Sequence, residues 1–159
     1  MLVLNVAWRK IKMNIIKFIV VTVVLLWNSI YDLNYKKISI PVTFLGMIMG
    51  VFFIIITLIK NNGYYIIIEA LGGVSVGIFL ILCSFFTRGQ IGIGDGIICC
   101  FTGLFYGFFE NLSMLFIGLL LSALVSFLLL LSKKAGRKTE IPFVPFLFLG
   151  YCCIQICKI

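Results

Sequence analysis

Two aspartates are the residues of this 159-residue chain best suited to do chemistry. Asp32 and Asp95 are its only aspartates, and each stands where an apolar stretch meets a polar one. An ionisable side chain at the edge of an apolar stretch is costly, which makes it a functional candidate by default. Two carboxyl groups held close together cannot both ionise cheaply, so one keeps its proton. Such a pair can hydrolyse a peptide bond, because the ionised carboxylate accepts a proton from water while its partner polarises the carbonyl.

The composition indicates a membrane protein. Apolar residues make up 63% of the chain and charged residues 11%, with a mean hydropathy of +1.25. A soluble domain has about 45–50% apolar and about 25% charged residues, so a water-soluble globule is excluded. The chain has no histidine, which excludes histidine-based triads and metal sites. Its six cysteines form no CxxC pair, and we expect neither a metal ion nor another cofactor.

The apolar stretches predict the elements that must position the aspartates. We expect an all-α polytopic membrane protein, a single domain over residues 1–159 built as a compact bundle of about six transmembrane helices. The expected spans are Ile15–Tyr31, Val42–Ile59, Tyr65–Phe86, Ile93–Phe109, Leu112–Leu131 and Ile141–Cys157. Glu110-Asn111 is the expected tight turn between the fourth and fifth spans. Three glycine pairs at a spacing of four favour close helix packing: Gly46 with Gly50, Gly73 with Gly77, and Gly103 with Gly107.

Counting membrane crossings places the two aspartates on one side. Asp32 ends the first span, and two crossings later the chain returns to Asp95 at the start of the fourth. Two further crossings bring the chain back to this side at the basic loop Ser132–Glu140 and the segment around Pro142. Glu140 is expected to form an ion pair with a neighbouring cation of that loop. The same count places Glu69 and Glu110 on the opposite side of the membrane.

Three strings, in this order, resemble motifs of the type IV prepilin peptidase family, the GxGD aspartic proteases of prokaryotic membranes. The first begins at Asp32 and ends in an Ile-Pro pair, and the second is the GIGD string that closes with Asp95. The third is IPFVPFL, over Ile141–Leu147. The resemblance implies that Asp32 and Asp95 are catalytic. It implies supporting roles for Ile40, Pro41, Gly92, Gly94, Pro142, Phe143 and Pro145.

The glycines before Asp95 also have a physical interpretation. Gly92 and Gly94 lack side chains, so a substrate strand or a neighbouring helix can approach closely there. The alternative interpretation is that glycine is simply frequent near helix starts.

The chain departs from the family pattern at three places. Gly96-Ile97 stands where the family usually has a lysine two residues after the second aspartate, and Val42 replaces an asparagine after the Ile-Pro pair. The first departure could alter substrate choice or tuning of the dyad. The zinc-binding insertion of the larger relatives, which also methylate the new amino terminus, is absent, and this puts methyl transfer in doubt.

The resemblance implies a membrane aspartic endopeptidase. It would remove the short basic leader of a prepilin-like precursor, such as a type IV pilin, a pseudopilin or a flagellin-type protein, at the cytoplasmic face of a prokaryotic cell membrane. The expected partners are this membrane-inserted substrate and anionic lipids. Nucleic acid is not expected, because basic residues in a multi-span protein usually reflect orientation and lipid headgroups. The sequence indicates neither the particular precursor nor the oligomeric state.

The sequence leaves alternatives open for the orientation of the chain in the membrane and for its function. The aspartate side carries seven basic residues and the other side six, which does not decide orientation. A start at Met13, with residues 1–14 largely outside the native protein, would reduce the six to three. A presenilin-like protease would need about nine spans and a Pro-Ala-Leu motif, which this chain lacks. A small proton-coupled transporter, or a non-enzymatic membrane scaffold, with Asp32 and Asp95 as ionisable pathway residues is the alternative from another class.

Overall fold

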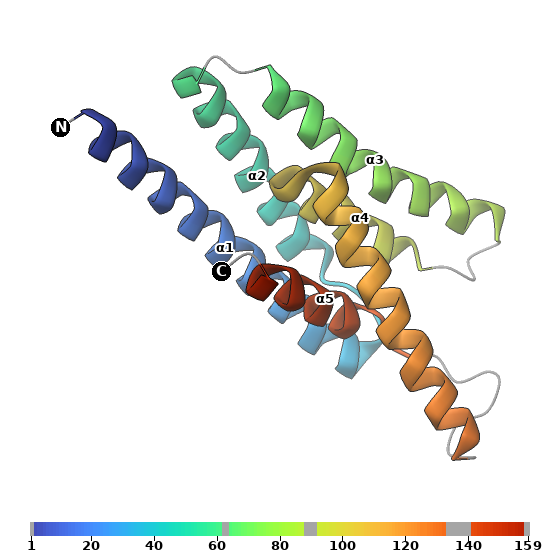
Figure 1. Cartoon of the computed structure of the whole chain (residues 1–159). Helices are drawn as coiled ribbons and strands as arrows, with labels where there is room; N and C mark the ends of the chain where they lie inside the picture. The colour runs from blue at the N-terminus through green and yellow to red at the C-terminus, as the bar shows by residue number, and fades with distance from the viewer. Residues whose placement is uncertain (1, 62–63, 88–91, 133–140, 158–159) are drawn as a thin grey trace.

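Five helices make up the described part of the chain. The computed structural model describes residues 2–61, 64–87, 92–132 and 141–157. The helices, in chain order, are α1 (Leu2–Tyr35), α2 (Ile40–Asn61), α3 (Tyr65–Phe86), α4 (Ile93–Leu131) and α5 (Val144–Cys157) (Figure 1). Four of them, α1 to α4, contain stretches long and apolar enough to cross a membrane. The expectation of an all-helical, multi-pass membrane protein is confirmed. The basic loop over residues 133–140, including Glu140, lies outside the described residues.

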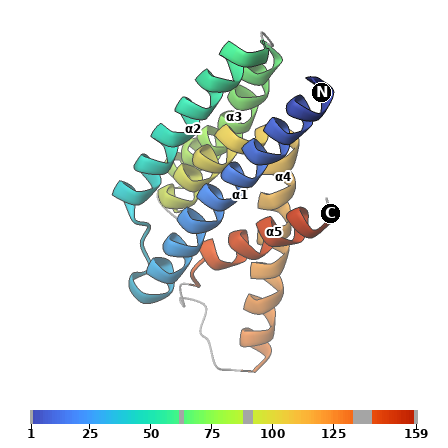
Figure 2. The same ribbon diagram turned by 90° about the vertical axis from the view of Figure 1, so that its left-hand side faces the viewer.

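The expected number of about six transmembrane helices is not confirmed. The fourth and fifth expected spans are both present, as two helical segments that meet within α4. Its backbone leaves helical geometry at Gly107, with φ 75° and ψ −170°. From this point the second half of α4 turns back and runs in roughly the opposite direction to the first half (Figure 2). The turn expected at Glu110-Asn111 is therefore wrong, since both residues are helical. Only glycine adopts such backbone angles without a steric penalty, so the reversal falls on Gly107.

A buried amide secures the reversal. The Asn111 side chain is fully buried and donates from Nδ2 to the carbonyl oxygens of Gly73 and Cys99, each at 2.8 Å. Its Oδ1 accepts a hydrogen bond from the Thr102 hydroxyl at 2.7 Å. Residues 99 and 111 would lie about 18 Å apart on a straight helix, so these contacts require the chain to fold back. Buried polar groups need such partners in an apolar bundle.

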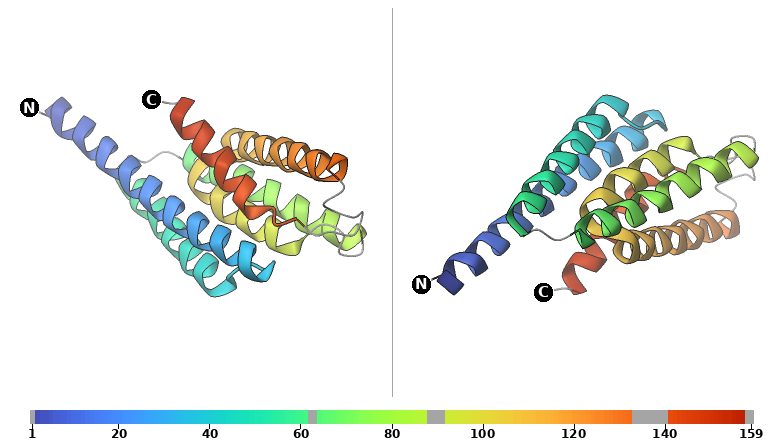
Figure 3. Two further views of the ribbon diagram at one scale, coloured as in Figure 1. Left: turned by 90° about the horizontal axis from the view of Figure 1, so that it is seen from below. Right: turned by 90° about the horizontal axis from the view of Figure 1, so that it is seen from above.

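The sixth expected span, Ile141–Cys157, is a shorter helix than expected. α5 begins at Val144 and has 14 residues, which is about 21 Å of helix. This is shorter than the roughly 30 Å hydrocarbon layer that a spanning helix must cross. α5 packs against α1 and α4, and it lies between them in Figure 3.

The glycine spacing indicates helix packing correctly. A Cβ atom at Gly73 would collide with the backbone of Gly103, and one at Gly77 would collide with the backbone at Cys100, so α3 and α4 meet backbone to backbone. Gly46 instead receives the ring of Phe101. The core between the helices is apolar and includes Val21, Leu25, Ile98, Phe101, Val144, Leu147 and Tyr151.

Candidate active site

One cavity gathers the sequence-predicted residues at a single end of the bundle. Its volume is about 630 Å³. It is lined by Asp32, Lys36, Lys37, Ile38, Ile40, Gly92, Gly94, Asp95, Ile141, Pro142 and Phe143. These residues come from the end of α1, the connection to α2, the start of α4 and the segment before α5. The expectation that both aspartates and the Pro142 segment share one side is thus confirmed.

The Asp32 carboxyl is held by the start of α5. Its side chain is 7% exposed. The backbone N–H of Val144 donates to Asp32 Oδ2 at 3.1 Å, and the backbone of Phe143 also hydrogen-bonds to this carboxyl. Sequence positions 32 and 144 are therefore joined directly. The contact gives a structural role to the string Ile141–Leu147, which includes the start of α5, because its amides at Phe143 and Val144 point to the Asp32 carboxyl.

The end of α1 has a specific geometry. Lys36 adopts a left-handed backbone conformation with φ 52°, and its N–H bonds to the carbonyl oxygen of Asp32 at 2.8 Å. Asn28, fully buried one turn before Asp32, accepts a hydrogen bond from the backbone N–H of Ser39 at 2.9 Å. These bonds terminate the helix just after Asp32 and pull the following loop back beside it.

Asp95 lies in the first turn of α4. Its backbone N–H bonds to the carbonyl oxygen of Gly92 at 3.1 Å, and Gly92 is the N-terminal cap. A Cβ atom on Gly92 would stand 3.0 Å from Asp95 Oδ2, and one on Gly94 would stand 3.0 Å from Ile38. Gly92 thus leaves room for the Asp95 carboxyl, and Gly94 leaves room for the α1–α2 connection. The close approach of a substrate strand at these glycines stays a prediction. The charge on Asp32 acts on Asp95, so the two carboxyl groups are electrostatic neighbours.

The two remaining prolines lie beside the cavity and do not line it. Pro41 occupies the first turn of α2 and Pro145 the first turn of α5. A missing N–H is tolerated there, and the fixed φ of proline favours helix initiation.

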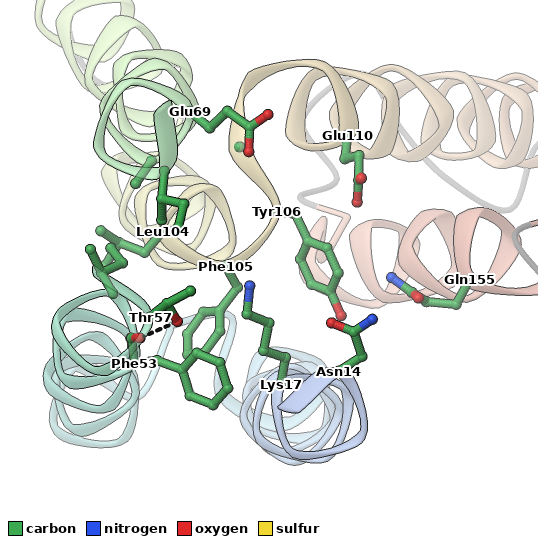
Figure 4. A pocket seen from close by; sticks show the side chains of 15 residues that line it. Asn14, Lys17, Phe53, Thr57, Glu69, Leu104, Phe105, Tyr106, Glu110 and Gln155 are labelled. Carbon is green, nitrogen blue, oxygen red and sulfur yellow. Dashed lines mark hydrogen bonds between the residues drawn. The ribbon is translucent and has the colours of Figure 1, made fainter. Parts of the chain in front are cut away.

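A second polar cavity, of about 500 Å³, lies at the other end of the bundle. Figure 4 shows Glu69, Glu110, Lys17, Tyr106 and Gln155 around it. Both glutamates are thus separate from the aspartates, as the crossing count predicts. The Lys17 amine stands 5.3 Å from the centre of the Phe53 ring.

Sequence reasoning missed three groups that position the residues of the aspartate site. Asn28 gave a signal, since it is a polar residue within an apolar span, four positions before Asp32. Ile38 gave none, because its role depends on contact with Gly94 across the bundle. The Val144 amide is a backbone group, and its partner is 112 positions away.

Comparison with known proteins agrees with this geometry. The model of the type IV leader peptidase family matches residues 19–131, a region that includes both aspartates and ends before Pro142. No curated protein and no solved structure matches the chain. Because the family match covers most of the sequence, the chain belongs to the type IV leader peptidase family.

Proposed function

We propose that this protein is a membrane aspartic endopeptidase in which Asp32 and Asp95 form the catalytic dyad. The observation that carries the proposal is that both side chains, remote in sequence, line one cavity at one end of the helices. Family membership supports peptide hydrolysis in general, and the matched region contains both carboxyl groups.

The chemistry requires one ionised and one protonated carboxyl. The carboxylate accepts a proton from a water molecule, whose oxygen attacks the scissile carbonyl carbon. The protonated partner donates to the carbonyl oxygen, which gives a tetrahedral diol. The diol then collapses, the C–N bond breaks, and the nitrogen leaves with a proton from the dyad. One water is consumed, and one carboxylic acid and one amine are formed.

The proposed substrate is a prepilin-like precursor cleaved after its short basic leader at the cytoplasmic face. Family membership supports this class of substrate. The position of the cavity at one end of the helices fits cleavage at the membrane surface, where a membrane-inserted helix can deliver its terminus without complete extraction into water. Lys36 and Lys37 line the cavity. Anionic lipid headgroups are proposed to screen these cations from the basic leader.

Co-expression with a prepilin from the same genome tests the proposal. Leader removal is scored by the change in precursor mobility. Asp32→Asn and Asp95→Asn should each lower cleavage by at least about 10²–10⁴-fold, the usual contribution of general acid–base catalysis, while the protein still accumulates in membranes. Glu69→Gln is the matched control, since it makes the same chemical change at an exposed position of the other cavity. Cleavage by either aspartate variant at the rate of this control would refute the dyad.

The alternative from another class is a small proton-coupled transporter with Asp32 and Asp95 as ionisable pathway residues. Flux driven by a pH gradient in proteoliposomes, without precursor cleavage, would favour the transporter.

A further inference from the structure

The start of α5 has one backbone donor that the helix does not use. The amides of Phe146 and Leu147 bond to the carbonyl just before the helix, at 3.0 and 3.1 Å. Pro145 has no N–H. The Val144 N–H donates to Asp32 Oδ2 at 3.1 Å. The backbone N–H of Val144, which makes no hydrogen bond within α5, therefore donates to Asp32.

The two aspartates differ in this respect. Asp32 accepts backbone hydrogen bonds from Val144 and Phe143 and faces the positive end of α5. Both effects favour its ionised form. Asp95 also lies in the first turn of a helix, but within the described residues no protein group donates to its carboxyl. The charge of Asp32 acts on Asp95, and repulsion between like charges favours a proton on the member with fewer donors.

We propose that the α5 terminus assigns the roles within the dyad, with Asp32 as the ionised base and Asp95 as the protonated acid. This inference rests on the proposed peptidase function. Asp32 takes the proton from water, and Asp95 gives its proton to the carbonyl oxygen. The Val144 amide is then a positioning group, which acts on catalysis through Asp32.

The other charged groups near the dyad do not make this distinction. Within the described residues, Lys36 and Lys37 are the only further charged groups that line the cavity. Both side chains are exposed, so solvent and salt screen their effect on the aspartates. The start of α5 contributes no titratable side chain to the cavity. Among the described residues, the difference in hydrogen-bond donors between the two carboxyl groups therefore comes from the backbone amides of Val144 and Phe143.

The composition of the chain makes the assignment directly measurable. Because Asp32 and Asp95 are the only aspartates, a full-length protein labelled with ¹³C at the aspartate side-chain carboxyl gives two carboxyl resonances. Asp32→Asn and Asp95→Asn identify each resonance by its loss. As the pH of the nanodisc sample is lowered, Asp95 should gain its proton first, and Asp32 should stay ionised until lower pH. Protonation of Asp32 first, or of both in one common step, would overturn the assignment.

A backbone ester tests the role of the amide. Replacing Val144 by its α-hydroxy analogue removes the N–H, keeps the side chain, and makes the Phe143 carbonyl a weaker acceptor for the amides of Phe146 and Leu147. A hydrogen bond to a carboxylate stabilises the ionised form of that carboxylate. Its loss should therefore move protonation of Asp32 to higher pH by about one to two units, and move the acidic limb of the cleavage profile with it. The matched control is the ester at Leu147, whose N–H bonds to the Phe143 carbonyl just before α5 and not to an aspartate.

The titration and the cleavage assay test the role of the Val144 amide and the peptidase function separately. An equal response to the esters at 144 and 147 would overturn the positioning role, whatever the cleavage activity. If the carboxyl titration follows the expected order but the wild-type protein cleaves no precursor, the assignment of protonation holds and the proposed peptidase function fails.

Discussion

Gly92→Ala is a small change that should displace the carboxyl of Asp95, a member of the proposed dyad. The new Cβ would stand 3.0 Å from Asp95 Oδ2, whereas ordinary contacts begin at 3.4 Å, so the carboxyl must retreat by about 0.4 Å. The φ and ψ of residue 92, −64° and 122°, are available to alanine, so the backbone need not change. A misplacement of about 1 Å can cost about 10²-fold in rate. We expect kcat/KM for precursor cleavage to fall about tenfold, or about 1.4 kcal/mol of transition-state stabilisation.

The assay is cleavage of a purified precursor in nanodiscs, with Gly72→Ala as the control. Its Cβ is similarly crowded, at 3.2 Å from the Cβ of Phe108, but it lies on α3, away from the residues of the aspartate cavity. The control should cleave at the wild-type rate. Cleavage by Gly92→Ala within about twofold of wild type would refute the reasoning, since a tenfold loss is expected from the displaced carboxyl. An equal loss in both variants would attribute the effect to general destabilisation.

Two further predictions concern the framework that holds the site. Gly103→Ala should lower the free energy of unfolding by about 2–3 kcal/mol, because its Cβ would collide with the backbone of Gly73 and force α3 and α4 apart; unfolding in mixed micelles measures this, and wild-type stability would contradict the close approach. Asn111→Ala removes three hydrogen bonds and should cost about 2 kcal/mol, at about 0.6 kcal/mol for each bond in a membrane helix bundle. A melting temperature unchanged from wild type would show that Asn111 does not secure the reversal at Gly107.

Much of the site could be predicted from residue types and spacing. Asp32 and Asp95 stand out because ionisable residues are rare in apolar stretches, and an even number of crossings between them places them on one side. The same count correctly separates Glu69 and Glu110 from the dyad. These inferences needed only hydropathy and order along the chain.

The number and length of the helices were less predictable. Glu110-Asn111 is polar and was expected to form the turn, but Asn111 is buried and satisfied by carbonyl oxygens on two helices. Hydropathy reports the polarity of a side chain and not whether the fold provides partners for it. The reversal falls instead on Gly107, where only the tertiary packing requires a positive φ.

The sequence alone determined that this chain lies in a membrane, that its helices pack through glycines, and that two carboxyl groups share one end. It could do so because the cost of placing polar groups in hydrocarbon acts on each segment separately. Only the tertiary structure decided that the amide of Val144 bonds to Asp32 and none bonds to Asp95 in the described residues. That contact joins a backbone group to a residue 112 positions away, and backbone amides are the same in every sequence except at proline.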